Sequence, residues 1–262
     1  MCNNNNITVT LLGTGTSGGV PSLGCQCEVC RSKDPRDHRL RCVALVESAA
    51  GTRVLIDCGP DIRQQLMSLP FKPFDAILMT HIHYDHVGGI DDLRPFSVFG
   101  PINLYGDEKT CDHVRQIMPY CFGEHLYPGA PRLELHTVRP HEPLRIGDLE
   151  IIPIEVMHGK MPILGFRIGK FAYITDMKTI GDAELPYLDG VETLVVNALR
   201  FEKEHHSHQL VADAAEFAHK IGAKQTYITH VCHHIGLYDE AEKRMPEGLS
   251  LAYDGLKLNM ER

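Results

Sequence analysis

The chain has 262 residues, of which 43% are hydrophobic and 23% are charged, and this balance excludes a disordered protein. Its formal net charge of −8, from 26 Lys and Arg against 34 Asp and Glu, disfavours a strongly basic nucleic-acid-binding protein. No apolar run approaches the roughly 20 residues that a membrane-spanning helix needs. We find no low-complexity linker and therefore predict a single domain over residues 1–262.

Short β-branched or apolar runs, bounded by Gly, Pro, Asn or Asp, predict strands along most of the chain. In chain order these runs cover residues 7–12, 42–47, 53–56, 75–80, 144–156, 163–168, 171–175, 194–198 and 225–228. Helical spacing predicts helices at residues 61–69, 107–118 and 211–221, the last with Gly222 as its stop. Because the strands and helices do not alternate strictly, we expect two mixed sheets with helices outside them.

Two segments of the chain echo one another. Leu55-Ile56-Asp57 is matched by Ile174-Thr175-Asp176, and Met79-Thr80-His81 by Ile228-Thr229-His230. Each half thus delivers an Asp from one strand end and a His from another. Ligands at strand ends sit on rigid supports and can converge on one cleft.

A run of histidines carries the strongest functional pattern. His81, His83, Asp85 and His86 place four potential metal donors within six residues, directly after an apolar strand. In an extended segment, side chains at positions i and i+2 point the same way. His81 and His83 can therefore hold one ion while Asp85 and His86 face a second. Mixed imidazole and carboxylate donors suit Zn, Mn or Fe.

Six residues cannot complete two metal shells, so further ligands must come from elsewhere in the chain. His158, Asp176 and His230 each lie just beyond an apolar strand and are the best candidates. Taken singly, each would more often be an ordinary surface or core residue. Together with the histidine run they indicate a two-metal site.

Three cysteines form a second cluster. Cys25, Cys27 and Cys30 are soft thiolate donors at a spacing suited to tetrahedral Zn. The residues leave the fourth donor open among His38, Cys232, His233 and His234. An odd total of nine cysteines, with neither a basic nor an apolar leader in the first six residues, favours reduced thiols and a cytoplasmic protein over a disulfide framework.

The run 81–86, the opening segment 12–21 and Asp57-Cys58-Gly59 resemble the metallo-β-lactamase-fold hydrolases. Within that superfamily the chain is similar to the phosphodiesterase branch, which includes tRNA 3′-processing endonucleases and the cyclic-phosphate phosphodiesterase of the carbon–phosphorus lyase (phosphonate) pathway. The resemblance extends over residues 11–256. It implies an α/β fold, a four-layer αββα sandwich with two mixed β-sheets, and a dinuclear site at one edge of the sheets.

The resemblance also distributes the ligands. It implies that one metal is held by His81, His83 and His158, that the other is held by Asp85, His86 and His230, and that Asp176 bridges them. It points to His233 as the fourth ligand of a structural zinc in the Cys-rich loop at 25–30.

The same branch implies a catalytic role for His208, in the segment 204–208, where it contacts phosphate and can protonate the leaving oxygen. We assign Asp85 as a further catalytic residue. Asp57 is the best candidate to support a ligating imidazole through a hydrogen bond, ahead of Asp61, Asp91 and Asp92.

We therefore predict a phosphoric diester hydrolase with two catalytic divalent ions, Zn or Mn, and one structural Zn. In this hypothesis a hydroxide bridging the two metals attacks a small phosphodiester, with a ribosyl cyclic phosphate as one candidate. We expect neither membrane nor nucleic-acid partners, and a homodimer is one alternative for the assembly.

Three alternatives stay open. A tRNA 3′-processing endonuclease shares the catalytic residues, but the Gly- and Pro-rich arm of that branch is absent from the sequence. Lactone or thioester hydrolysis on the same fold is disfavoured by His208 and its surroundings. A non-catalytic metal-binding protein is disfavoured because all seven proposed ligands of the metal pair are present.

Overall fold

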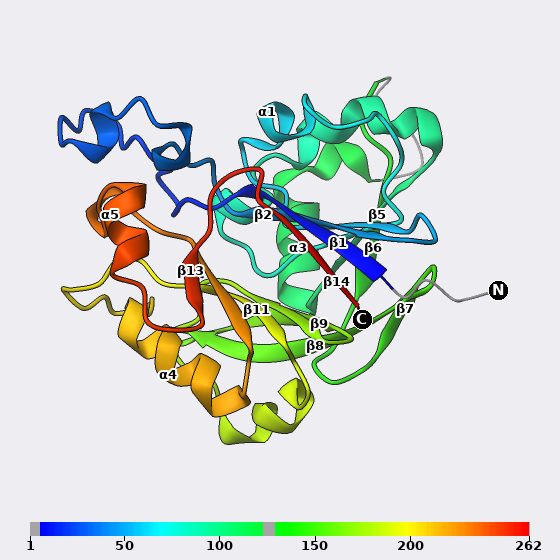
Figure 1. Cartoon of the computed structure of the whole chain (residues 1–262). Helices are drawn as coiled ribbons and strands as arrows, with labels where there is room; N and C mark the ends of the chain where they lie inside the picture. Colours follow the sequence, from blue (N-terminus) through cyan, green and yellow to red (C-terminus); the bar gives the residue numbers. More distant parts are fainter. Residues whose placement is uncertain (1–5, 123–128, 262) are drawn as a thin grey trace.

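A computed structural model describes residues 6–122 and 129–261, which leaves the extreme N-terminus used for the cytoplasmic prediction outside the described part. Two seven-stranded mixed sheets lie face to face in these residues (Figure 1). In spatial order the first sheet contains β14 (Lys257–Glu261), β1 (Asn6–Gly13), β2 (Val43–Ser48), β3 (Arg53–Ile56), β4 (Ala76–Leu78), β5 (Ile102–Gly106) and β6 (Leu133–Thr137). The second contains β13 (Leu249–Leu251), β12 (Gln225–Thr229), β11 (Thr193–Asn197), β10 (Phe171–Ile174), β9 (Met161–Ile168), β8 (Leu149–His158) and β7 (Leu144–Ile146).

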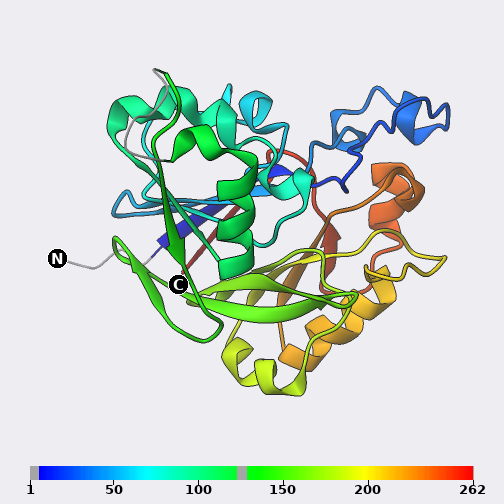
Figure 2. The same ribbon diagram turned by 180° about the vertical axis from the view of Figure 1, so that it is seen from behind.

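Helices cover the outer faces of the two sheets. The α-helices are α1 (Ile62–Leu66), α2 (Tyr84–Val87), α3 (Glu108–Ile117), α4 (Val211–Ile221) and α5 (Tyr238–Lys243). The 3-10 helices are η1 (Val29–Arg31), η2 (Pro35–Asp37), η3 (Ile90–Phe99), η4 (Pro119–Cys121), η5 (Asp182–Leu188) and η6 (His233–Ile235). Seen from behind, α3 and α4 lie on different sheets (Figure 2). None of the helices in the described residues has the length and apolar character needed to cross a bilayer.

Three hydrophobic clusters show how the layers pack. The period of two in a strand sends alternate side chains to opposite faces of its sheet. In β3, Val54 and Ile56 join the core between the sheets, whereas Leu55 packs outward under α1 and α3. In β10, Tyr173 faces the central core and Ile174 packs outward with α4. Three cores separate four layers, which confirms the predicted αββα sandwich.

Parallel strands bring the predicted ligands to one edge of the sandwich. β3 pairs in parallel with β4 and on to β5, and β10 pairs in parallel with β11 and on to β12. Asp57 and His81 follow β3 and β4, whereas Asp176 and His230 follow β10 and β12. The carboxyl ends of parallel strands lie at the same edge of a sheet. The predicted convergence of these residues therefore has a topological cause.

Candidate metal centre

The seven residues predicted to hold a metal pair gather into two groups. The first group is His81, His83, His158 and Asp176, and the second is Asp85, His86, Asp176 and His230. Within each group the potential ligand atoms all lie within 4.8 Å of one another. Asp176 belongs to both groups. One of its carboxylate oxygens lies 3.0 Å from His230 Nε2, and the other lies 3.7 Å from His81 Nε2.

An unusual backbone conformation occurs at two of these residues and at the supporting residue Asp57. Asp57, Asp176 and His230 each follow a strand and adopt a positive φ, of 66°, 58° and 55°. The left-handed region is sparsely populated by residues other than Gly and often marks a functional site. The sharp turn at each strand end directs the side chain across the edge of the sheet.

Hydrogen bonds fix which nitrogen faces the site in several of the imidazoles. His86 Nδ1 donates to Asp57 Oδ2 at 2.7 Å. His158 Nδ1 lies 2.7 Å from the carbonyl oxygen of Asp176 and 2.9 Å from that of Ser207, and donates to them. A donor at Nδ1 leaves Nε2 with a free lone pair, the usual arrangement around a bound metal.

Thr80 extends the same arrangement to His81. The Thr80 hydroxyl lies 2.9 Å from Asp57 Oδ2 and donates to this carboxylate, so its lone pair can accept from His81 Nδ1, also at 2.9 Å. The Thr80 backbone N–H donates to Asp57 Oδ1 as well. Asp57 thereby bonds directly to His86 in one group and, through Thr80, to His81 in the other. Nothing in its sequence context identified Thr80 as the link.

The free nitrogens at the centre test whether these residues fit a metal. The Nε2 atoms of His81, His86 and His230 are buried and form no well-aligned hydrogen bond with the described residues, although carboxylate oxygens lie 3.7 Å, 3.2 Å and 3.0 Å from them. An unpaired buried polar group costs free energy, so such a set persists where a ligand satisfies it. Burial also lowers the pKa of His81 well below its ordinary value, which keeps this imidazole neutral as a metal ligand must be. The residues therefore fit divalent cations.

Asp176 supplies negative charge at the centre. Burial alone would raise the pKa of its carboxyl group, but the imidazoles of His230 and His86 that face it hold that pKa well below its ordinary value. Asp176 therefore remains an ionised carboxylate between the two groups of histidines. An oxygen on each side of one buried carboxylate is what a shared metal ligand requires.

His208 lies beside the metal groups without belonging to either. Its ring centroid is 4.7 Å from that of His158 and 4.8 Å from that of His230. Its Nδ1 is buried without a partner among the described residues. Burial lowers the pKa of His208 to about 3, so the imidazole is neutral in the free site at pH 7. His208 therefore lies beside one histidine of each group.

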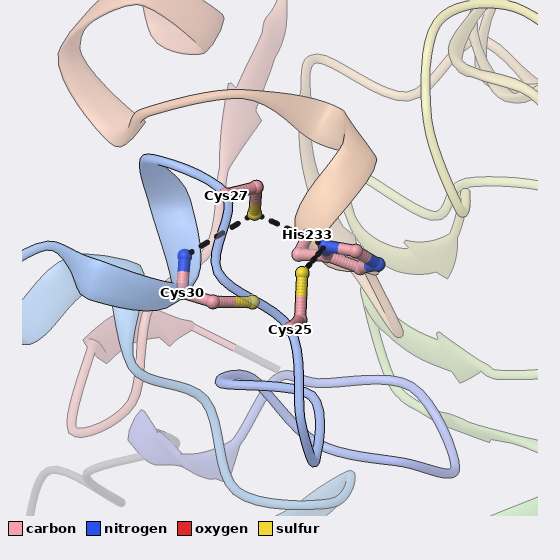
Figure 3. A group of neighbouring side chains, drawn as sticks. All are labelled: Cys25, Cys27, Cys30 and His233. Atoms are coloured by element: carbon pink, nitrogen blue, oxygen red, sulfur yellow. Dashed lines mark hydrogen bonds between the residues drawn. The ribbon is translucent and has the colours of Figure 1, made fainter.

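The Cys-rich loop forms a separate cluster (Figure 3). Potential ligand atoms of Cys25, Cys27, Cys30 and His233 lie within 4.8 Å of one another, and His233 Nδ1 is 3.4 Å from Cys25 Sγ and 3.3 Å from Cys27 Sγ. The hydrogen bond to His233 is the largest cause that lowers the pKa of Cys27 to about 6. Three thiol groups and an imidazole at these distances suit a tetrahedral zinc. In the structure His38 instead lies 2.8 Å from the carbonyl oxygen of Ser32.

The weaker carboxylate candidates have other partners. Asp61 forms an ion pair with Arg41 at 2.7 Å, and Asp91 pairs with Arg94 at 2.8 Å. The Asp57-Cys58-Gly59 motif has a packing role in addition to its carboxylate, because a Cβ at Gly59 would collide with the carbonyl oxygen of Asp85. This close approach seats the histidine run against the end of β3.

The geometry agrees with comparisons to known proteins. Residues 52–231 match the family described as the beta-lactamase superfamily domain. The chain belongs to the β-lactamase superfamily. A solved structure described as a new diphosphatase from the PhnP family is 40% identical to this chain. The match covers 97% of both chains and has a TM-score of 0.89. The metallo-β-lactamase fold is therefore confirmed, and both comparisons support a metal-dependent hydrolase.

The curated relatives that this chain matches are longer than the chain itself. An octanoyltransferase from Porphyromonas gingivalis is 42% identical over 247 residues, which are 94% of this chain and 50% of the relative. A ribonuclease Z from Bradyrhizobium is 32% identical over 163 residues, 60% of this chain and 48% of the relative. The chain thus spans about half the length of these proteins.

Proposed function

We propose that the protein hydrolyses small phosphodiesters at a pair of divalent metal ions, with a third ion, zinc, held by Cys25, Cys27, Cys30 and His233. The observation that carries the proposal is the position of Asp176 between two groups of ligands, with His208 beside them. Bound divalent ions would polarise the phosphoryl oxygens and lower the pKa of an attacking water. Zn and Mn both suit this donor set.

The remaining chemistry falls to the residues of the chain. His81, His83 and His158 would hold one ion, and Asp85, His86 and His230 the other, with Asp176 shared. Asp57 and Thr80 keep the imidazoles of His86 and His81 in the tautomer that presents Nε2.

His208 would contact a phosphate oxygen and donate a proton to the leaving group. Its imidazole is neutral in the free site, but the negative charge of a bound phosphate raises the pKa of a neighbouring imidazole. Substrate binding would therefore protonate His208, and protonated His208 can stabilise the departing oxygen.

A diphosphate is the second candidate substrate. The observation that favours it is the 40% identity over 97% of both chains to a protein described as a diphosphatase. Cleavage of a P–O–P linkage and of a phosphodiester both require attack at phosphorus opposite a leaving oxygen. The activity of the octanoyltransferase is not carried over, because the chain spans only half of that protein.

Parallel assays test the proposal. Protein loaded with Zn or Mn is incubated with bis-p-nitrophenyl phosphate, a ribosyl cyclic phosphate, a nucleoside diphosphate ester and a precursor tRNA. We expect turnover of the small phosphodiesters that His208→Ala reduces and His219→Ala, a change on the exposed face of α4, leaves unaltered. Cleavage of the precursor tRNA alone would favour the endonuclease, and hydrolysis of none of the four would overturn the proposal.

A further inference from the structure

The strand between two ligand-bearing strands carries a buried asparagine. β11 lies between β10 and β12, and the residues that follow those two strands include Asp176 and His230. Asn197 ends β11, and its side chain is fully buried. A buried amide costs free energy unless its donor and its acceptor are both bonded. The partners of Asn197 therefore show what this amide does at the edge of the sheet.

The amide of Asn197 binds one residue at two points. Its Oδ1 accepts from the Met177 N–H at 2.7 Å, and its Nδ2 donates to the Met177 carbonyl oxygen at 2.9 Å. The last backbone pair of β10 with β11 joins Ile174 to Val196, so these side-chain bonds hold the chain to β11 beyond the end of the strand. Met177 is itself fully buried, and water cannot replace Asn197 as the partner of its backbone.

The same peptide unit supports a candidate metal ligand on its other side. The peptide bond that joins Asp176 to Met177 donates its N–H to Asn197. Its carbonyl oxygen lies 2.7 Å from His158 Nδ1, which donates to it. Hydrogen bonds at the two ends of one peptide unit polarise and strengthen each other. The Asn197 amide therefore makes this carbonyl oxygen a better acceptor and favours the His158 tautomer that presents Nε2.

The other side of the segment 176–179 is tied to the end of β8. Lys178 N donates to the Met157 carbonyl oxygen at 2.7 Å, and Met157 N donates to the Thr179 carbonyl oxygen at 2.9 Å. The segment is therefore held between the end of β8, which carries the histidine ligand, and the end of β11. Asn197 supplies the bonds on the β11 side.

The turn at Asp176 needs this support. Its φ of 58° lies in the left-handed region, which costs free energy for a residue other than Gly and persists where the surrounding structure holds it. Without the Asn197 amide, the buried N–H and carbonyl oxygen of Met177 would have no partner, and the turn would relax toward a position in which they find one. Such a shift would move the shared carboxylate relative to the histidines.

We propose that Asn197 is a positioning residue of the metal centre. By holding the peptide unit after Asp176, it sets the direction of the shared carboxylate and strengthens the support of His158. Both of these residues belong to the first group of ligands, whereas only Asp176 belongs to the second. Asn197 therefore controls the affinity of the first group for its ion more than that of the second. This inference rests on the proposed function only in that divalent ions occupy the two groups.

Metal titration of two variants tests the proposal. Asn197→Ala removes both bonds to Met177, and the control Asn103→Ala removes an asparagine that accepts from His136 outside the metal groups. Protein freed of the metal pair is titrated with Zn against a chromophoric chelator. In Asn197→Ala we expect the affinity for one ion to fall about 10–100-fold, as when a ligand loses its hydrogen-bond partner, and that for the other to fall less. Asn103→Ala should match the wild type. Unchanged affinities, or an equal fall for both ions, overturn the proposal.

NMR of protein labelled with ¹⁵N-histidine gives a readout that a general loss of stability would not produce. The signal of the His158 Nδ1–H proton is assigned with His158→Gln. In Asn197→Ala this proton should exchange with water faster, although the Ser207 carbonyl oxygen at 2.9 Å stays as a second acceptor. The Nδ1–H proton of His86, which bonds to Asp57, should exchange as in the wild type. Equal acceleration of both protons, or of neither, overturns the role of Asn197.

The isosteric variant Asn197→Asp keeps the proposal testable if Asn197→Ala does not fold. A carboxylate accepts from the Met177 N–H as the amide does, but it donates to the Met177 carbonyl oxygen only when it is protonated. At high pH we expect weaker binding of the first ion than in the wild type, and this deficit should shrink as the pH is lowered. The comparison at each pH cancels the protonation of the histidines, which both proteins share. No deficit at high pH, or a deficit that low pH leaves unchanged, overturns the proposal.

The metal measurements separate this role from the reaction. If bis-p-nitrophenyl phosphate is not hydrolysed by the wild type, the proposed function fails, and the titration still decides whether Asn197 positions the ligands. If that compound is hydrolysed and Asn197→Ala binds both ions as the wild type does, the function stands and the positioning role fails.

Discussion

Asp57 and Asp176 occupy equivalent places in the two halves of the sandwich. β1, β2 and β3 pair antiparallel before the parallel step to β4, and β8, β9 and β10 do the same before the parallel step to β11. Each Asp follows the third of these strands, is fully buried and has a positive φ. One backbone arrangement thus delivers two carboxylates to the same edge.

The neighbouring strand decides what each carboxylate does. Beside β3, the segment after β4 offers the Thr80 N–H and hydroxyl, and both bind Asp57. Beside β10, the side-chain amide of Asn197 at the end of β11 accepts from the Met177 N–H and donates to the Met177 carbonyl oxygen. The Asp176 carboxylate accepts from the hydroxyl of its neighbour Thr175 instead. Asp57 therefore supports histidines, while Asp176 faces their free nitrogens.

We expect the greatest loss of activity from a change to Asp176, the carboxylate that lies between the two groups of histidines. Asp176→Ala should abolish turnover, by more than the roughly 10²–10³-fold cost of losing one hydrogen-bond donor, because both ions lose a ligand. Metal analysis should show weaker binding of both ions, and Asp182→Ala, an exposed carboxylate, should behave as wild type. Retention of two ions with a near wild-type rate would exclude Asp176 as the shared ligand.

His208→Ala removes a residue of the second half that touches neither Asp. We expect unchanged metal content and a rate lowered by roughly 10²–10⁴-fold, the range for losing a general acid. The loss should be greatest for a sugar alkoxide leaving group and smaller for p-nitrophenolate, which departs without a proton. Equal losses for both leaving groups would reduce His208 to an electrostatic contact, and a loss of metal would make it a ligand.

Asp57→Asn changes the carboxylate that supports the histidines. The amide keeps the shape of the carboxylate but gives His86 Nδ1 a weaker acceptor, so metal affinity should fall about 10–100-fold. At saturating metal the variant should regain most of its rate. Titration of activity against free metal measures this shift. If the Asp57→Asn protein stays inactive at any metal concentration, Asp57 is as essential to the reaction as Asp176 and does not act only by supporting His86.

The smallest expected effect on chemistry comes from the third cluster. Cys27→Ser should lower the melting temperature, because metal binding there is coupled to folding, and should leave kcat within a few-fold of wild type. Metal analysis of the wild type should approach three ions per chain, and the variant should approach two. Cys111→Ser, at a buried thiol outside the cluster, controls for the loss of any buried sulfur.

Much of the candidate site could be predicted because its residues fall at strand ends. The histidine run and the residues after β8, β10 and β12 follow apolar stretches that are visible in the sequence. Helix 211–221 was predicted with its observed bounds, because Gly222 takes a left-handed φ of 71° at the stop. Helix 61–69 is shorter than predicted and ends at Leu66, so that the segment after it leads toward Pro70 as an irregular connection.

Other features depend on contacts between distant segments. β14 has the mixed sequence Lys257–Glu261 and becomes a strand because β1 offers it an antiparallel edge. β5 and β6 were not predicted either, and they pair with each other in parallel. The echo of the two halves holds for the Asp residues, but His81 follows the strand next to β3, whereas His230 follows the second strand from β10. These positions depend on which strands are neighbours in each sheet, and local sequence patterns do not show that order.

The cluster of Cys25, Cys27 and His233 joins residues 208 positions apart in the chain. A metal at that point would act as a cross-link that closes most of the chain into one loop. Closing a long loop removes conformational entropy from the unfolded chain, and this penalty grows only slowly with loop length. The bound ion would therefore stabilise both sheets at once through the unfolded state, even though its ligands touch only one corner of the folded protein.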